Sequence, residues 1–292
     1  MEQTLRGAPV AAVVSDLSCY GRAALTVSIA ALSAMGVQAV PLPTAVLSSH
    51  TGGFGRPAKA DLTAFMRECA AHWREIGLRF DAICTGYMAN LEQAEAAEEF
   101  LQMHPESIKV VDPVMGDHGK MYSSLPAEMP GRMIRLAKGA LITPNRTEAA
   151  LLTGLELSER PEKLLEALLE KTQASCALIT GAENANVWME RAEGRLHALP
   201  YEPEPGAYPG TGDLFAAVLT GALAQGARME RAVEKAAGFV KRAVARTRAV
   251  GSDSRCGVQF EGLLHLLAED GAQCYNNAGD LCHATERGGN AI

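Results

Sequence analysis

The sequence lacks the motifs of several large enzyme and binding classes. It has no Gly-x4-Gly-Lys-Ser/Thr loop, which excludes a P-loop kinase, and no Gly-x-Gly-x-x-Gly after the first predicted strand, which weighs against a Rossmann oxidoreductase. No apolar run approaches the length of a membrane-spanning helix. The 27 basic and 34 acidic residues give a formal net charge of −7, so we expect neither nucleic acid nor an anionic membrane as a partner.

The cysteines also lack the spacings of a disulfide framework or a metal site. The count of seven is odd, no Cys-x-x-Cys occurs, and Cys274, Cys282 and His283 do not have the spacing of a zinc site. We therefore expect reduced thiols and a cytoplasmic location. The N-terminal stretch has no signal-peptide cleavage pattern, which agrees with that expectation.

Short apolar segments alternate with longer helical patterns along the 292 residues. Strands that are apolar throughout are typical of a parallel sheet covered on both faces. Strand–helix–strand repetition predicts a three-layer α/β/α fold with a mostly parallel central sheet. The predicted strands are 10–15, 38–42, 81–85, 109–112, 140–143 and 177–180. The predicted helices are 23–35, 61–76, 91–103, 147–152, 162–172, 213–225 and 229–247.

The segment 186–202 breaks this rhythm, because apolar and polar residues alternate around Glu193-Gly194. It predicts an antiparallel hairpin at a sheet edge. We expect one domain over residues 1–270 without a large lid, followed by a poorly ordered tail over 271–292. In parallel sheets ligands bind at the carboxyl ends of the strands. Here those ends carry polar, glycine and proline residues, as a site requires.

Residues 208–215, YPGTGDLF, place two glycines and an aspartate at the start of a long apolar helix. The unpaired amides of a helix N-terminus attract an anion. Gly210, Thr211 and Gly212 can therefore form an anion hole for a phosphoryl group, with Asp213 as the base that accepts a proton from an attacking hydroxyl. An ordinary capped helix start, with Thr211 as the cap, explains the same residues equally well. The helix dipole further predicts that Asp213 is ionised and a weak base.

Three ordered motifs together resemble one family. The stretch PGTGDLFAAVLTGAL resembles the C-terminal signature of the ribokinase-like superfamily, and VVDPVMGDHGKMY (110–122) and LITPNRTEAALLTG (141–154) are similar to its vitamin-kinase branch, the pyridoxal kinases. The resemblance runs from about residue 10 to residue 267. It implies ATP-dependent phosphorylation of the 5′-hydroxymethyl group of a B6 vitamer, with Mg²⁺. It also implies a homodimer, and a monovalent cation such as K⁺ is a further candidate cofactor.

The resemblance also implies substrate residues. Ser15, Thr44, His50 and Tyr87 would contact the vitamer, together with Asp213. Three of them have a plainer explanation. A strand-end serine such as Ser15 lies in a turn, an isolated histidine such as His50 is usually structural, and Tyr87 packs at a strand end as readily as it stacks on a ring.

For the nucleotide side, the resemblance places Mg²⁺ at Asp112 and Glu148, held partly through water. Asn145 and Glu148 share one face of a helix's first turn, where they also fit a capping box. Thr180 stands where some relatives carry lysine, which leaves its phosphate contact in doubt. The full set implied for the nucleotide and metal is Asp112, Asp117, Thr143, Asn145, Glu148, Thr180, Gly181, Gly210 and Gly212.

Two other functions stay open. A hydroxymethylpyrimidine kinase of thiamine synthesis shares the fold, although its relatives often end the signature in Gly-Thr-Gly-Cys where this chain has Asp213. A non-catalytic binder of a B6 vitamer or nucleotide is the second, and the intact Asp213 argues against it. A sugar kinase would bring an Asn- and Asp-rich N-terminal site and a larger lid, and neither is visible.

Overall fold

The computed structural model describes residues 7–202, 206–268, 274–275 and 281–282. Its centre is a nine-stranded sheet in the order β11-β10-β9-β8-β5-β4-β1-β2-β3. The interior strands run parallel. These are β1 (Val10–Ser18), β2 (Gln38–Leu47), β4 (Ala82–Thr85), β5 (Ile108–Val111), β8 (Leu141–Ile142) and β9 (Cys176–Ala182). All six predicted strands are confirmed, with shifted ends.

Both edges of the sheet are antiparallel. The strands β10 (Ala185–Glu190) and β11 (Leu196–Pro200) form the expected edge hairpin beside β9. At the other edge, β3 (Lys59–Asp61) pairs with the end of β2. A separate small hairpin, β6 (Gly116–Asp117) with β7 (Lys120–Met121), lies outside the main sheet. Neither β3 nor this small hairpin was predicted.

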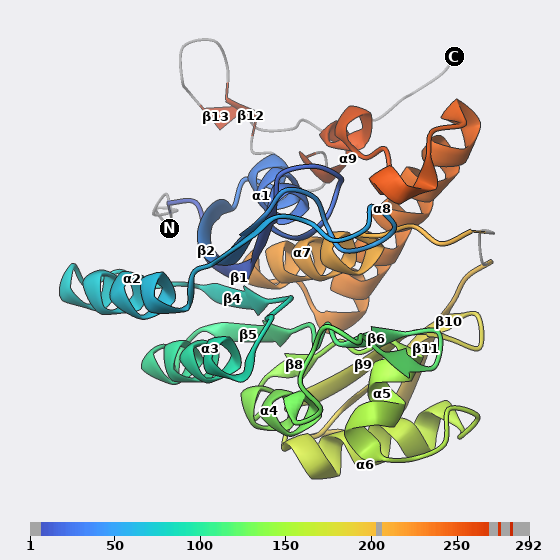
Figure 1. The fold of residues 1–292 in the computed structure, drawn as a ribbon. Coiled ribbons are helices and arrows are strands. Elements are labelled where there is room, and N and C mark those ends of the chain that lie inside the picture. The colour runs from blue at the N-terminus through green and yellow to red at the C-terminus, as the bar shows by residue number, and fades with distance from the viewer. Residues whose placement is uncertain (1–6, 203–205, 269–273, 276–280, 283–292) are drawn as a thin grey trace, which may run out of the picture.

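Helices cover both faces of the sheet (Figure 1). One layer holds α1 (Ala24–Ala34), α7 (Thr211–Ala224), α8 (Met229–Val250) and α9 (His265–Ala268). The other holds α2 (Thr63–Glu75), α3 (Leu91–Met103), α4 (Met129–Leu136), α5 (Arg146–Thr153) and α6 (Pro161–Thr172). Two 3₁₀ turns follow α8, at Ser254–Cys256 and Glu261–Leu263. The three-layer α/β/α prediction is confirmed, and the described residues form no separate lid domain.

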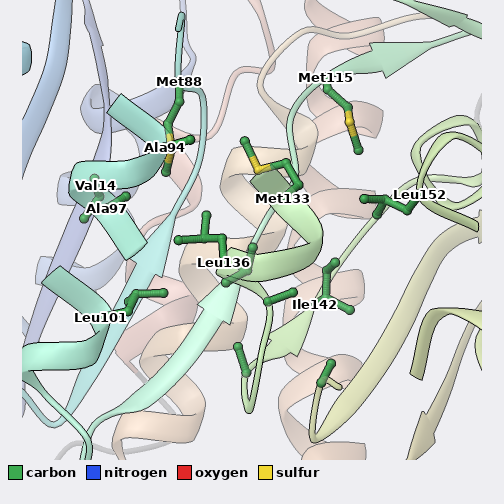
Figure 2. Close-up of a cluster of buried hydrophobic side chains, with 14 of the residues drawn as sticks. Val14, Met88, Ala94, Ala97, Leu101, Met115, Met133, Leu136, Ile142 and Leu152 are labelled. Carbon is green, nitrogen blue, oxygen red and sulfur yellow. The ribbon is translucent and has the colours of Figure 1, made fainter. Parts of the chain in front are cut away.

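Each face of the sheet has its own hydrophobic core, because successive strand residues point to opposite faces. Val14 and Ile142 contribute to the core under α2–α6, while Val13 and Leu141 contribute to the core under α1, α7 and α8. Figure 2 shows the first core, in which side chains from β1, α3, α4, β8 and α5 converge. Burial on both faces explains why these strands read as apolar throughout.

The tail prediction concerns 271–292, of which the structure describes β12 (Cys274–Tyr275) and β13 (Leu281–Cys282) as an antiparallel pair. The rest of that prediction lies outside the described residues. Within the described ranges, the chain forms no helix long and apolar enough to cross a membrane.

Candidate active site

The turn 208–212 delivers Asp213 to the carboxyl-end edge of the sheet. Gly210 is the N-cap of α7, and Asp213 lies in the first helical turn. A small pocket of about 10 Å³, room for about one water, is bordered by Asp213, by Ser15 of β1 and by Asp112, which directly follows β5. The carboxyl ends of β1 and β5 therefore meet the start of α7 at this pocket.

Glycine serves a different purpose at Gly210 and at Gly212. Gly210 has a φ of +82°, and a Cβ there would overlap the carbonyl oxygen of Arg22, so the protein's own backbone requires glycine at this position. Gly212 has no positive φ, and a Cβ there would face the Oδ2 atom of Asp112 at 3.6 Å. The space at Gly212 thus opens toward the acidic side of the site, where a ligand can approach the amides.

The amides at the start of α7 are placed for an anion. The amide of Leu214 donates to the Gly210 carbonyl at 2.9 Å, and that of Thr211 makes a long bond of 3.4 Å to the Tyr208 carbonyl. Among the hydrogen bonds of the described residues, no acceptor is recorded for the amides of Gly212 and Asp213. Two donors therefore stay available beside Asp213, as the anion-hole interpretation needs.

Asp213 is buried, and burial opposes its charged form. Burial raises the pKa of Asp213 above its ordinary value, although the nearby backbone amide of Ala24 lowers it. Ala24 supplies this amide with a φ of +54°, an unusual backbone conformation for alanine. Burial therefore acts against the helix dipole, and the expectation that Asp213 is a weak base stays a prediction.

Asp112 and Asp16 are buried carboxylates near Asp213, and the buried Glu148 lies near Asp112. Burial, with the nearby charges of Glu148 and Asp213, raises the pKa of Asp112 well above its ordinary value. Burial also raises the pKa of Glu148 to about 8, against the lowering effect of three backbone amides. Burial raises the pKa of Asp16 to about 6, with Ser18 lowering it and Asp213 raising it. Negative charge is therefore disfavoured here until a cation joins it.

Asn145 and Glu148 form the capping box of α5. The Asn145 side chain accepts from the Glu148 amide at 2.9 Å, and Glu148 Oε2 accepts from the Asn145 amide at 2.9 Å. Glu148 Oε1 accepts from the Met115 amide at 3.0 Å. Asn145 Nδ2 donates to the Gly116 carbonyl at 2.9 Å. The capping explanation is thus present in the structure, and the metal role of Glu148 stays a prediction.

The acidic groups fit Mg²⁺ in a limited way. The buried Asp112 carboxylate, 8% exposed, has no hydrogen-bond donor recorded among the described residues and shares its surroundings with two other acids. A divalent cation would relieve that repulsion. No group of three or more His, Cys, Asp or Glu side chains within the described residues is placed to hold a metal. Mg²⁺ would therefore take most ligands from phosphates and water, as it commonly does.

Three predicted vitamer residues lie together under the site. The Tyr87 amide donates to Ser15 Oγ at 3.2 Å, and Thr44 Oγ1 donates to the Tyr87 carbonyl at 3.1 Å. Thr44 is 0% exposed, so its hydroxyl supports the strand end, and its contact with a ring stays a prediction that this geometry does not favour. Burial raises the pKa of Tyr87, and a hydrogen bond with Ser124 lowers it.

His50 is also engaged by the protein. Its Nδ1 accepts from the Gly52 amide at 3.0 Å, and its Nε2 lies 2.7 Å from the Arg255 carbonyl oxygen. Both ring nitrogens are thus used, and the predicted contact of His50 with the vitamer stays a prediction without a free ring atom to carry it.

The remaining nucleotide residues line the adjoining strand ends. Asp117 lies in β6 and accepts from the His118 amide at 2.7 Å. Thr143 is buried, and its Oγ1 donates to the Val111 carbonyl at 3.5 Å. Thr180 donates its amide to the Pro144 carbonyl, and Gly181 has a φ of +71°. Their contacts with ATP stay predictions.

Sequence reasoning missed two groups at the site. The first is Asp16, which adjoins the predicted Ser15. An acid inside the apolar run AAVVSDLS was the signal that could have identified it as a site residue. Ala24 was missed because nothing in an alanine codes for a left-handed backbone.

A wide pocket lies at the opposite edge of the sheet. Its volume is about 1350 Å³, and Pro9, Asp81 and Ile108, which border it, stand at the amino ends of their strands. It shares none of the acids discussed above, so the chemistry points to the carboxyl-end edge instead.

Comparison with known proteins identifies the family of the chain. The phosphomethylpyrimidine kinase family model matches residues 19–257. A pyridoxine/pyridoxal/pyridoxamine kinase of Bordetella avium is 30% identical over 250 residues, 80% of this chain and 83% of that protein. A hydroxymethylpyrimidine/phosphomethylpyrimidine kinase of Bacillus subtilis is 32% identical over 184 residues, 60% of this chain and 67% of that protein.

Two crystal structures are closely similar. Pyridoxal kinase from Lactobacillus plantarum has a TM-score of 0.82 at 34% identity and covers 89% of this chain and 96% of its own. A presumed phosphomethylpyrimidine kinase from Bacteroides thetaiotaomicron, in a crystal form with pyridoxal, has a TM-score of 0.81 at 35% identity with the same coverage of 89% and 96%. The glycine turn, its aspartate and the parallel sheet agree with these matches, and this chain belongs to the phosphomethylpyrimidine kinase family, in the ribokinase-like superfamily with the pyridoxal kinases.

Proposed function

We propose that this protein transfers the γ-phosphate of ATP to the 5′-hydroxymethyl group of pyridoxal, pyridoxine or pyridoxamine. The observation that carries the proposal is the position of Asp213 beside the open amides of Gly212 and Asp213, across from Asp112. A phosphoryl acceptor needs a base and an anion hole within one small space, and this turn supplies both.

In this reaction Asp213 accepts the proton of the attacking hydroxyl. Its raised pKa makes it a stronger base than an exposed aspartate, and the nearby Ala24 amide favours its charged form. The amides at the start of α7 stabilise the charge on the equatorial oxygens of the moving phosphoryl group. Most of the rate then comes from positioning and charge stabilisation.

Asp112 is the residue that would hold Mg²⁺, with Glu148 behind it. The ion supplies positive charge that neutralises the ATP phosphates. We place the phosphates along the strand ends that carry Asp117, Thr143, Thr180 and Gly181. Asn145 keeps α5 in place through its bond to the Gly116 carbonyl. K⁺ is a further candidate at the phosphates.

The vitamer ring would lie beside Ser15 and Tyr87, because the Ser15 hydroxyl borders the pocket that Asp213 borders. We further propose one kinase domain over residues 1–270, a homodimeric assembly and a cytoplasmic location, as the resemblance implies.

The second candidate is a hydroxymethylpyrimidine or phosphomethylpyrimidine kinase. The family model and the B. subtilis relative favour it, and the aminopyrimidine also carries a hydroxymethyl group. Asp213, where many such kinases have cysteine, favours the B6 vitamers.

The deciding experiment measures ADP formation with pyridoxal, pyridoxine, pyridoxamine and hydroxymethylpyrimidine side by side. We expect the B6 vitamers to give the higher kcat/KM and a phosphorylated product by mass spectrometry. Preference for hydroxymethylpyrimidine supports the second candidate. Vitamer binding without any product supports a non-catalytic binder.

A further inference from the structure

The loop between β2 and β3, residues 48–58, crosses to the segment that follows α8, residues 251–260. We call these the substrate loop and the C-terminal segment. His50 of the substrate loop is 6% exposed. Since its Nδ1 accepts from the Gly52 amide, the ring proton sits on Nε2, which donates to the Arg255 carbonyl across 2.7 Å. One side chain thus joins two segments about 200 residues apart in sequence.

An aromatic contact runs beside this hydrogen bond. The Phe54 ring lies 5.1 Å from the His50 ring and 5.3 Å from the Tyr20 ring, both at steep angles. The Arg255 guanidinium lies over Phe54 at 5.5 Å. Asp253 in turn holds Arg255 through paired bonds. The substrate loop is therefore docked on the C-terminal segment by several side chains, with His50 as its buried member.

The same two segments pack against the turn 208–212, which carries the proposed anion hole. A Cβ at Gly52 would lie 3.2 Å from the Pro209 ring, and a Cβ at Gly257 would lie 3.1 Å from the Pro209 carbonyl oxygen. The Gly257 position also packs against the Arg22 carbonyl, which is the group that confines Gly210. Little slack remains in this packing, so movement of either segment would reach the turn.

We propose that His50 is a positioning residue, which locks the substrate loop onto the C-terminal segment and so holds the turn 208–212 in register with Asp213. The role rests on the proposed kinase function. It acts through the Arg255 carbonyl and needs no contact between His50 and the substrate.

Two effects follow from this lock. A loosened turn places the amides of Gly212 and Asp213 less well, which lowers kcat. A loosened substrate loop also admits water beside the γ-phosphate, so that ATP is hydrolysed without phosphorylation of the vitamer. A histidine that only filled space would lower the amount of folded enzyme and leave this coupling intact.

Two variants separate the two hydrogen bonds of His50. His50→Asn can still accept from the Gly52 amide but is too short for the Arg255 carbonyl, whereas His50→Gln can reach that carbonyl. We expect His50→Asn to lower kcat about tenfold and to raise the ratio of ADP to phosphorylated vitamer several-fold, with the KM for ATP within about twofold of wild type. We expect His50→Gln to keep most of kcat and to form ADP and phosphorylated vitamer in a ratio near one.

Equal kcat and equal coupling in His50→Asn and wild type would overturn the proposal, as would equal damage in both variants. If His50→Asn does not fold, Phe54→Leu replaces it, because that partly exposed ring can be removed without touching the buried hydrogen bond. We expect the same rise in uncoupled ATP hydrolysis there, and unchanged coupling would count against the lock.

A second experiment, limited proteolysis, does not depend on catalysis. Chymotrypsin cleaves after Phe54, and the rate of that cut in the protein without ligands reports how often the substrate loop leaves the C-terminal segment. We expect the cut to be several-fold faster in His50→Asn than in wild type or His50→Gln, with equal melting temperatures as the control. An unchanged rate would overturn the lock, while an inactive wild-type enzyme would overturn the kinase function alone.

Discussion

Asp213 is the residue on which the proposed chemistry depends most. We expect Asp213→Asn to lower kcat by about a hundredfold to ten-thousandfold, since it removes the proton acceptor. Because burial disfavours the charge of Asp213, the neutral amide should keep or raise the melting temperature at pH 8. Steady-state kinetics, thermal melts and nucleotide titrations check this. Retained kcat would exclude Asp213 as the base, and loss of folding would give it a structural role.

Gly210 and Gly212 offer a matched pair. Gly210→Ala must adopt a left-handed conformation and meets the Arg22 carbonyl, so we expect a loss of more than about 1–2 kcal/mol in the free energy of unfolding. Gly212→Ala faces ordinary contact distances, so its melting temperature should stay within about 2 °C of wild type.

Per folded molecule, we expect Gly212→Ala to lose more activity than Gly210→Ala. The Gly212→Ala methyl group points toward Asp112, into the space proposed for phosphate, and we expect it to lower kcat/KM for ATP about tenfold or more. Urea unfolding and initial rates on the same samples check both halves. An active Gly212→Ala enzyme would show that no phosphate approaches this glycine.

At the scale of elements, the capping box of α5 can be tested separately from the site. Asn145→Ala removes the cap and should cost about 1 kcal/mol of unfolding free energy, or about 2 °C in melting temperature. Asn145→Ser keeps a capping oxygen but loses the bond to the Gly116 carbonyl.

The serine variant should therefore recover most of the stability and little of any lost activity, because Gly116 belongs to the stretch beside the proposed phosphates. Thermal melts and kcat measured in parallel separate the two contributions. Equal activity of the serine variant and wild type would leave Asn145 with a capping role alone.

The alternation of strands and helices was predictable because each core strand is buried on both faces. Strand ends were less predictable. The predicted strand 38–42 contains Pro41 and stops before Pro43, yet β2 continues to Leu47. In the stretch that holds both prolines, β2 pairs only with β1, since β3 joins it only from Ala45 onward. A missing amide hydrogen costs little on such a free side.

Two elements were invisible for different reasons. The helix α4 carries Pro130 and Gly131 in its first turn, residues typical of a turn, and tertiary burial of Met129 and Met133 stabilises it instead. The hairpin β6–β7 has two residues in each strand, too few to show a period. The motifs located the acids of the site, whereas the desolvation of those acids depends on packing between distant segments.

At the scale of the whole molecule, the acids make stability depend on pH. An acid whose pKa is raised by folding favours the folded state below its unfolded pKa, and this contribution is lost as pH rises through the folded pKa. For Asp16, with a pKa of about 6 against 3.8, about 3 kcal/mol is lost between about pH 4 and pH 6.

Asp16→Asn should abolish that part of the pH dependence. We expect the variant to melt close to wild type at pH 4 and above it at pH 7, since Ser18 can still donate to the amide oxygen. Calorimetry at both pH values, without Mg²⁺ or nucleotide, measures the difference. A constant difference across this window would mean that Asp16 ionises in the folded chain as readily as in the unfolded one.

The left-handed alanine at the start of α1 has a practical consequence for anyone redesigning this enzyme. Substituting glycine at Ala24 would remove the Cβ that makes this left-handed backbone costly. The same change would give more freedom to the amide that favours the charged form of Asp213. Heat stability and turnover thus make opposite demands on the single methyl group of Ala24.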